Sequence, residues 1–236
     1  MSEIVLKNVT KNYGNVQGVS DITITLKPGI TGILGPNGAG KSTTMKLILG
    51  LSRPSIGYVD VNGSDPFVDW KLRSNIGFVP EYDCFYEHMT GMEYVSYFLR
   101  MHDVDGEEAD EKAKKALIEL GLEKSLNRKI RTYSRGMRQK TKVARATVFD
   151  PKILVLDEPF QGADPTTRHL LMGKMKKWAE EGKTILISSH ILHDIENLTD
   201  TIILIKNGKM LASGNRHEIR KLMDNIPRRV AVSPID

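Results

Sequence analysis

The sequence predicts a mixed α/β fold, in which an α/β core begins with an antiparallel β layer and is interrupted by an all-helical subdomain. Three observations support this class. Residues 3–9 and 22–26 alternate between apolar and polar side chains, as half-buried antiparallel strands do. From about 88 to 150 the apolar positions follow helical spacing, and afterwards strand and helix patterns alternate. We expect residues 1–236 to form one domain, with residues 88–150 as the inserted helical subdomain.

The first part of the chain contributes strands and one helix. The apolar run at 30–34 predicts a strand, and residues 42–49 predict a helix that follows a glycine-rich loop. Another short strand is expected at 58–61, because the Asn62-Gly63 pair after it is typical of a tight turn.

Three helices are predicted in the middle of the chain. Thr90 and Glu93 form a capping-box pattern that opens a helix to about residue 101. Alanine and leucine positions predict a second helix over 109–120, which Gly121 ends as its C-terminal cap. A third helix is expected over 134–149, shortly before Pro151.

Strands and helices alternate again in the last part of the chain. The predicted elements are a strand at 153–157, a helix at 166–181 ended by Gly182, a strand at 184–188 and a helix at 191–198. Residues 201–205 and 209–212 are expected to form a hairpin across Asn207-Gly208. Asn215 and Glu218 predict the cap of a last helix that reaches Met223.

The bulk composition excludes several classes of protein. No apolar run approaches the roughly 18 residues of a membrane-spanning helix. The single cysteine, Cys84, rules out an internal disulfide framework, and the acidic start Met1-Ser2-Glu3 leads us to expect no secretory signal. The net charge of +5 is spread over the chain without a basic stripe interleaved with aromatics, so we expect no nucleic-acid partner.

One motif carries a specific chemistry. Residues 35–42 match G-x-x-x-x-G-K-[ST] at each fixed position, between a strand pattern and a helix pattern. Glycines let successive backbone N–H groups point at phosphate oxygens, and the helix start favours an anion. Lys41 supplies a charge for the β- and γ-phosphates, and the Ser42 hydroxyl suits Mg²⁺. The motif predicts a P-loop NTPase core whose nucleotide-binding residues are Gly35, Pro36, Asn37, Gly38, Ala39, Gly40, Lys41, Ser42 and Thr43.

Two further strand ends carry candidate catalytic groups. Asp157 and Glu158 end a buried strand, at the edge where ligands bind in open α/β sheets. Asp157 suits Mg²⁺, and Glu158 can orient or deprotonate an attacking water. His190 follows the strand at 184–188 and can donate a hydrogen bond to a γ-phosphate. The alternatives are a pair of surface acids and a surface histidine.

Several segments follow one another in a fixed order along the chain. They are Tyr13, residues 35–42, Val79-Pro80-Glu81, Tyr133-Ser134-Arg135-Gly136-Met137, Asp157-Glu158-Pro159, Gly162-Ala163-Asp164 and His190. In this order they resemble the ATP-binding cassette (ABC) ATPases, the motor subunits of ABC transporters, from about residue 4 to 223. The sequence is most similar to their exporter-type branch in bacteria and archaea.

The resemblance implies roles for residues that their own patterns leave open. Tyr13 would stack on adenine, where the residues alone indicate only a turn aromatic. Glu81 would contribute an oxygen to Mg²⁺ and contact the nucleotide. Ser134 and Gly136 would cap the γ-phosphate of ATP bound to a second subunit, although Ser134 alone reads as a plain helix cap. The turn that ends at Asp164 would communicate between the two sites.

The sequence departs from the family pattern at four positions. Glu81 stands where the family usually has Gln, which keeps an oxygen but loses the amide donor. Arg135 and Met137 replace the commoner Gly and Gln, and Ala163 replaces a usual Leu. None of these changes removes a group assigned above to catalysis, so we expect ATP hydrolysis.

The resemblance implies an ATP-hydrolysing subunit that uses ATP and Mg²⁺ and powers transport, with export as the expected direction. Its expected partners are an integral membrane permease, docking near residues 80–88, and a second ABC ATPase subunit, identical or different. The expected location is cytoplasmic, peripheral on the inner face of the cell membrane. Two alternatives remain at this point: a soluble ABC-type ATPase acting on nucleic acid or ribosomes, and a nucleotide-gated regulatory module without useful catalysis.

Overall fold

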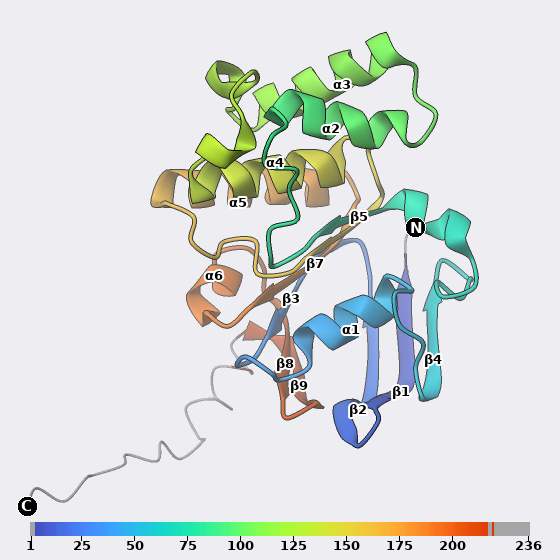
Figure 1. The fold of residues 1–236 in the computed structure, drawn as a ribbon. Helices are drawn as coiled ribbons and strands as arrows, with labels where there is room; N and C mark the ends of the chain where they lie inside the picture. The colour runs from blue at the N-terminus through green and yellow to red at the C-terminus, as the bar shows by residue number, and fades with distance from the viewer. Residues whose placement is uncertain (1–2, 217–218, 220–236) are drawn as a thin grey trace, which may run out of the picture.

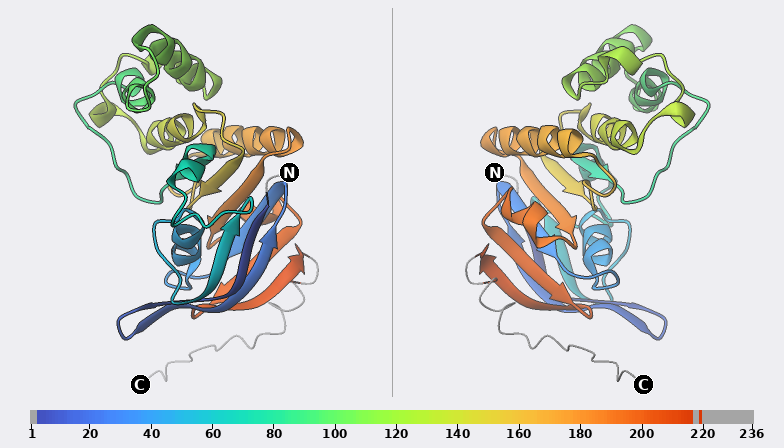
Figure 2. Two further views of the ribbon diagram at one scale, coloured as in Figure 1. Left: turned by 90° about the vertical axis from the view of Figure 1, so that its right-hand side faces the viewer. Right: turned by 90° about the vertical axis from the view of Figure 1, so that its left-hand side faces the viewer.

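The computed structural model describes residues 3–216 and Ile219. Two β-sheets and a helical part make up the fold, which confirms the predicted class (Figure 1). The helices α2, α3 and α4 lie at one end of the molecule and the antiparallel sheet lies toward the other, as both views of Figure 2 show. The predicted last helix falls largely outside the described residues, and its expected cap Asn215 ends a strand.

The first sheet is antiparallel and has the order β2-β1-β4. Its strands are β1 (Ile4–Tyr13), β2 (Val16–Leu26) and β4 (Ile56–Val61). Ile4 pairs with Leu26 on one side and with Val61 on the other, and all three side chains are buried. The first two strands are longer than the sequence predicts, because register shifts between Leu6 and Lys11 interrupt the alternation of buried and exposed residues.

The second sheet has six strands in the order β5-β6-β7-β3-β8-β9. Its members are β3 (Gly29–Leu34), β5 (Ile76–Val79), β6 (Ile153–Leu156), β7 (Thr184–Ser189), β8 (Thr201–Lys206) and β9 (Lys209–Asn215). All neighbours pair in parallel except β8 and β9, which form the predicted hairpin. Consequently, the C-terminal ends of β6, β7 and β3 lie side by side.

The helices are α1 (Lys41–Ile48), α2 (Gly91–Arg100), α3 (Gly106–Glu119), α4 (Arg135–Thr147), α5 (Pro165–Glu180) and the five-residue α6 (Leu192–Glu196). Short 3-10 turns occur at Trp70–Asn75, Glu123–Ser125 and Ile130–Thr132. The capping box predicted at Thr90 and Glu93 is formed in both directions. The helix expected at 191–198 is shorter than predicted.

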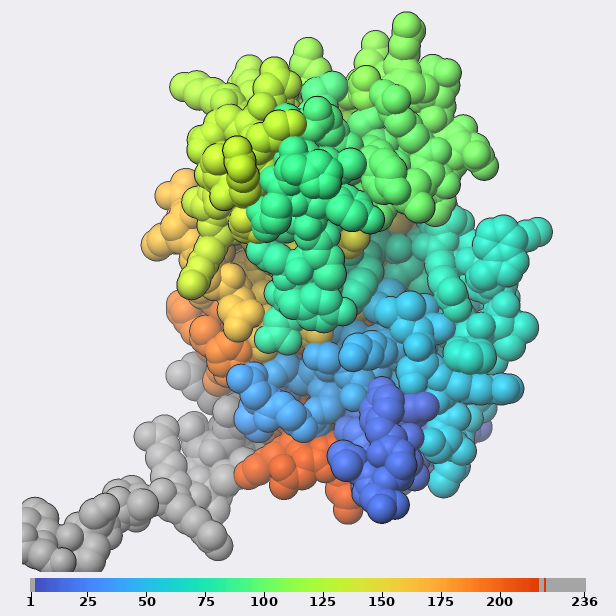
Figure 3. Space-filling view, viewed as in Figure 1, coloured from blue at the N-terminus to red at the C-terminus, as the bar shows by residue number. Residues whose placement is uncertain are grey.

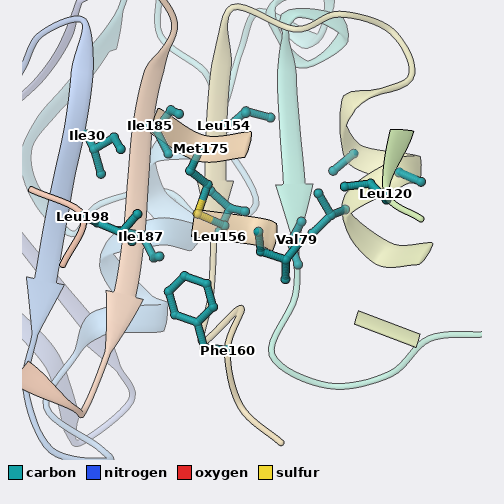
Figure 4. Packing of buried hydrophobic residues seen from close by; sticks show 14 of the residues in the cluster. Ile30, Val79, Leu120, Leu154, Leu156, Phe160, Met175, Ile185, Ile187 and Leu198 are labelled. Atoms are coloured by element: carbon teal, nitrogen blue, oxygen red, sulfur yellow. The ribbon is translucent and has the colours of Figure 1, made fainter. Parts of the chain in front are cut away.

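Two apolar clusters cover the two faces of the six-stranded sheet. One joins α1 to the antiparallel sheet through residues such as Met45, Ile48 and Leu6. The other joins the opposite face to α5 and the helical part, and Figure 4 shows Met175 from α5 among the side chains of the central strands. This packing holds the ends of β3, β6 and β7 in a fixed arrangement.

Candidate nucleotide site

The loop at 35–42 connects β3 to α1 with a backbone that its glycines make possible. Gly40 has a left-handed φ of 109°, and a Cβ there would lie 2.8 Å from the carbonyl oxygen of Gly18. A Cβ on Gly35 would lie 2.2 Å from the carbonyl oxygen of Ile205. Helix α1 then begins without a side-chain cap, so its first backbone N–H groups are available to an anion.

A cavity of about 480 Å³ opens at this loop. Its walls come from the hairpin end of β1 and β2, from the loop and first turn of α1, and from the segments that follow β5 and β6. In Figure 3 the green chain after β5 descends onto the light-blue surface of the α1 region. The lining residues are Tyr13, Val16, Gln17, Gly18, Pro36, Asn37, Gly38, Ala39, Gly40, Lys41, Ser42, Thr43, Glu81, Asp157 and Glu158.

Lys41 extends across the loop rather than into solvent. Its ammonium donates hydrogen bonds to the carbonyl oxygens of Gly35, at 2.7 Å, and Pro36, at 3.3 Å. The same nitrogen lies 3.2 Å from Oε1 of Glu158, an ion pair without hydrogen-bond alignment. Both side chains are 6% exposed, so their charges interact through protein more than through water.

Ser188, near the end of β7, contacts both acidic residues that follow β6. Its hydroxyl donates to Oδ1 of Asp157 at 2.6 Å and accepts from the backbone N–H of Glu158 at 2.8 Å. The parallel pairing of β6 and β7 brings these groups together. The sequence patterns do not single out Ser188, and the signal for it is its place two residues before His190 near a strand end.

Glu158 stands between a cation and an imidazole. Its backbone has a left-handed φ of 48°, a conformation that costs a residue with a side chain about 1 kcal/mol or more and that clusters at functional sites. Oε2 of Glu158 lies 3.0 Å from Nδ1 of His190, whose ring is 40% exposed. The carboxylate therefore contacts Lys41 on one oxygen and His190 on the other, close to the cavity's phosphate loop.

The remaining predicted residues fall into two places. Tyr13, 46% exposed, and Glu81 line the cavity with the phosphate loop, although more than 60 residues separate them in the sequence. Ser134, Gly136 and Asp164 do not line it. A Cβ on Gly136 would lie 2.6 Å from Oδ2 of Asp164, so these segments meet one another elsewhere on the surface.

Ser134 and Asp164 each begin a helix. The hydroxyl of Ser134 accepts from the backbone N–H of Met137 at 3.2 Å, as a plain cap does. The carboxylate of Asp164 accepts from the backbone N–H and the hydroxyl of Thr167. These hydrogen bonds hold the pKa of Asp164 below its usual value. Both segments thus present helix N-termini to the surrounding space.

The phosphate loop after β3 and the two carboxylates after β6 line one cavity and define a P-loop NTPase. A family model described as ABC transporter matches residues 19–161. The Nod factor export ATP-binding protein I of Burkholderia lata is 35% identical over 93% of this chain and 73% of the relative. Its namesake from Rhizobium etli is 33% identical over 93% and 70%, respectively. The chain belongs to the ABC transporter ATPases.

Solved structures agree with this assignment. A structure described as an ATP-binding subunit of an ABC transporter has a TM-score of 0.83 and 30% identity, over 94% of this chain and 93% of its own. A dimeric ATP-binding cassette in a post-hydrolysis state, bound to ADP and Pi, has a TM-score of 0.82 and 28% identity over 90% and 98%. The chain is thus an ATP-binding and ATP-hydrolysing subunit of an ABC transporter. Within the described residues, no helix has the length and apolar character needed to span a membrane.

Proposed function

We propose that this chain powers export through a separate membrane permease, hydrolysing ATP at the cavity beside the phosphate loop. The observation that carries the proposal is the contact of Glu158 with both Lys41 and His190 at the end of the central strands. The direction rests on relatives whose name is Nod factor export ATP-binding protein I. The alternative, an ATPase acting on nucleic acid or ribosomes, is not favoured by these relatives, and we propose no nucleic-acid partner.

ATP would lie along the cavity from Tyr13 to the phosphate loop. The half-exposed ring of Tyr13 offers a face on which adenine can stack. The phosphates would accept from the backbone N–H groups of residues 37–38 and 40–43 and from the Lys41 ammonium. Because Lys41 rests against a buried carboxylate, a γ-phosphate and Glu158 would compete for its charge.

Glu158 is the general base in this proposal. Its carboxylate would accept the proton of the attacking water, whose oxygen forms the new bond to the γ-phosphorus as the bond to the β-phosphate oxygen breaks. Doubly protonated, His190 would donate from Nδ1 to Oε2 of Glu158 across the 3.0 Å contact, which orients the carboxylate, and from Nε2 to a γ-phosphate oxygen. Ser188 keeps the backbone of Glu158 in place for this task.

The site fits Mg²⁺ by the chemistry of its donors. Ser42, Asp157 and Glu81 line one cavity and offer only oxygen ligands, which Mg²⁺ prefers. No cluster of three or more acidic, histidine or cysteine side chains with metal-site geometry occurs in the described part of the chain. Mg²⁺ is commonly held by one or two carboxylates together with phosphates and water, and Asp157 and Glu81 would be those carboxylates. When bound, it would neutralise charge on the phosphate oxygens.

A second cassette would complete the site. Ser134, Gly136 and Asp164 lie outside the cavity that holds the phosphate loop, yet they gather at two helix N-termini, which suit an anion. We therefore assign Ser134 and Gly136 to the γ-phosphate of ATP on another subunit, either a copy of this chain or a different cassette. The turn that ends at Asp164 would communicate between the two sites. A related cassette of known structure is a dimer.

The permease would dock on the helical part. We assign residues 88–150 to a helical subdomain of the single domain 1–236, and residues 80–88 to the docking region next to Glu81. Tyr82 and Tyr86 in this region are exposed, which favours a protein contact. With such a partner, the chain would be peripheral on the cytoplasmic face of the membrane.

Capture of the partner tests this proposal. Tagged chain carrying Glu158→Gln, purified from membranes in ATP, should bring down one integral membrane protein together with a second cassette. Vesicles containing that assembly should expel a substrate only with ATP. The proposal fails if the captured partner is a ribosome or a nucleic acid, or if the vesicles take substrate up from the side opposite to the cassette.

A further inference from the structure

Lys142 is a buried cation that the mechanism above does not use. It lies on the second turn of α4, the helix that Ser134 caps, and it is 4% exposed. Burial disfavours a charged ammonium and lowers the pKa of Lys142. A charged lysine is tolerated in a buried position when its N–H donors have acceptors, so the acceptors around Lys142 indicate its role.

The partners of Lys142 all belong to one short segment after β5. Its ammonium donates to the carbonyl oxygen of Pro80 at 3.1 Å and to that of Glu81 at 3.2 Å. The same nitrogen forms an ion pair with Oδ1 of Asp83 at 3.2 Å. Three acceptors match the three donors of an ammonium group. Lys142 therefore hydrogen-bonds to the carbonyl groups before and after the Glu81 α-carbon, although 61 residues separate Lys142 from Glu81 in the sequence.

Two neighbours on the same face of α4 reinforce this attachment. Arg138 forms a bidentate pair with Glu87, with nitrogen–oxygen distances of 2.6 and 2.8 Å, and Arg145 donates to the carbonyl oxygen of Phe78 at 2.8 Å. Positions 138, 142 and 145 follow the spacing of one helix face. Among these three, only Lys142 touches the backbone of Glu81 itself.

Glu81 lies between two hollows. It lines the cavity of the phosphate loop, and it also lines a second hollow together with Arg135, Lys142 and Gly162. Arg135 and Gly162 lie at the N-terminal ends of α4 and α5, which we propose to face ATP bound to the second subunit. The segment held by Lys142 is thus the link between the phosphate loop and the start of α4.

We propose that Lys142 is a positioning residue for hydrolysis. By fixing the backbone at Glu81, Lys142 holds the Glu81 carboxylate toward the phosphate loop. Because Lys142 belongs to α4, the same contacts couple the position of Glu81 to that of the Ser134–Gly136 segment, where α4 begins. This inference rests on the role proposed for Glu81. A side chain that supports a ligand-contacting group in this way affects the reaction more than the binding of ATP, because small misplacements reduce the rate steeply.

The test compares Lys142→Met with Lys142→Arg in the full chain. The matched control is Lys115→Met, which removes an exposed lysine from α3. The readouts are kcat, KM for ATP and the Mg²⁺ concentration for half-maximal rate, with thermal unfolding measured for each variant. We expect Lys142→Met to lower kcat by about tenfold or more and to raise the Mg²⁺ requirement, with ATP binding in the absence of Mg²⁺ changed less than about twofold. Lys142→Arg, which keeps donors and charge, should recover part of kcat.

Two results would be decisive, and a further variant covers a failure to fold. Equal kcat and Mg²⁺ dependence in Lys142→Met and Lys115→Met, with an active wild type, overturn the positioning role alone. An inactive wild type overturns the proposed hydrolysis instead. If Lys142→Met does not fold, Lys142→Gln carries the same prediction, since its amide can still donate to one carbonyl but not to all three acceptors.

Discussion

Replacing Glu158 by Gln removes the proposed base while leaving its size and one of its contacts. Glu158 touches Lys41 at 3.2 Å and His190 at 3.0 Å. An amide can still meet His190, but it cannot accept a proton from water at neutral pH. General-base catalysis contributes typically about 10²–10⁴-fold, so we expect kcat to fall by at least about 10²-fold, or roughly 2.7 kcal/mol in the barrier.

Although kcat should fall in Glu158→Gln, the affinity for ATP should stay the same or rise. In the wild type the buried carboxylate of Glu158 competes with phosphate for the ammonium of Lys41. The neutral amide removes that competition, so the Kd for ATP should stay the same or fall. With binding intact and turnover lost, an ATP-bound dimer should accumulate.

Phosphate release, equilibrium binding of a fluorescent ATP analogue and size-exclusion chromatography with ATP measure the three effects. Glu180→Gln, which changes an exposed carboxylate on α5, is the control and should behave as the wild type. A Glu158→Gln variant whose kcat stays within about threefold of the wild type would refute the assignment of the base, since that ratio is far below the roughly 10²-fold that general-base catalysis typically contributes.

Three other changes test separate parts of the site. Tyr13→Ala should weaken ATP binding by about tenfold in an equilibrium titration while Tyr13→Phe does not, because stacking on an aromatic ring contributes about 1–3 kcal/mol; equal affinities would exclude stacking. Glu81→Gln should shift the Mg²⁺ concentration for half-maximal hydrolysis, and an unchanged metal dependence would sink a ligand role for Glu81. The Arg138 hydrogen bond lowers the pKa of Glu87, so this pair stabilises the fold above the usual carboxyl pKa and loses its effect as pH falls through the lowered value. Glu87→Gln should therefore reduce the free energy of unfolding by about 0.5 kcal/mol at pH 7 in urea titrations and by nothing in acid, and an equal loss at both pH values would count against the ion pair.

Local sequence patterns were sufficient to predict the phosphate loop and most of the helices and strands around it. The motif at 35–42 encodes its own conformation, since Gly35 and Gly40 stand where a Cβ would collide with backbone. The capping box at Thr90 could also be predicted from the sequence, because both of its hydrogen bonds lie within one helical turn.

Contacts between segments that lie far apart in the sequence could not be predicted from local patterns. Strand β5 has only four residues, Ile76–Val79, and is recognisable mainly by its pairing with β6. Ser188 acquires its place beside Asp157 from the parallel register of β6 and β7. In the sequence Lys142 looks like an ordinary polar residue of a helix. Its role becomes visible only through its hydrogen bonds to the carbonyl oxygens of Pro80 and Glu81. The grouping of Gly136 with Asp164 likewise depends on how α4 and α5 meet.

We propose that ATP hydrolysis at the phosphate loop of this chain drives its membrane partner. The most direct measurement is Mg²⁺-dependent phosphate release by the assembly purified with that partner, compared between the wild type and Lys41→Ala. We predict turnover in the wild type and its loss in the variant, because Lys41 is the cation of the loop. ATP binding in the wild type without phosphate release above the level of Lys41→Ala would contradict the claim.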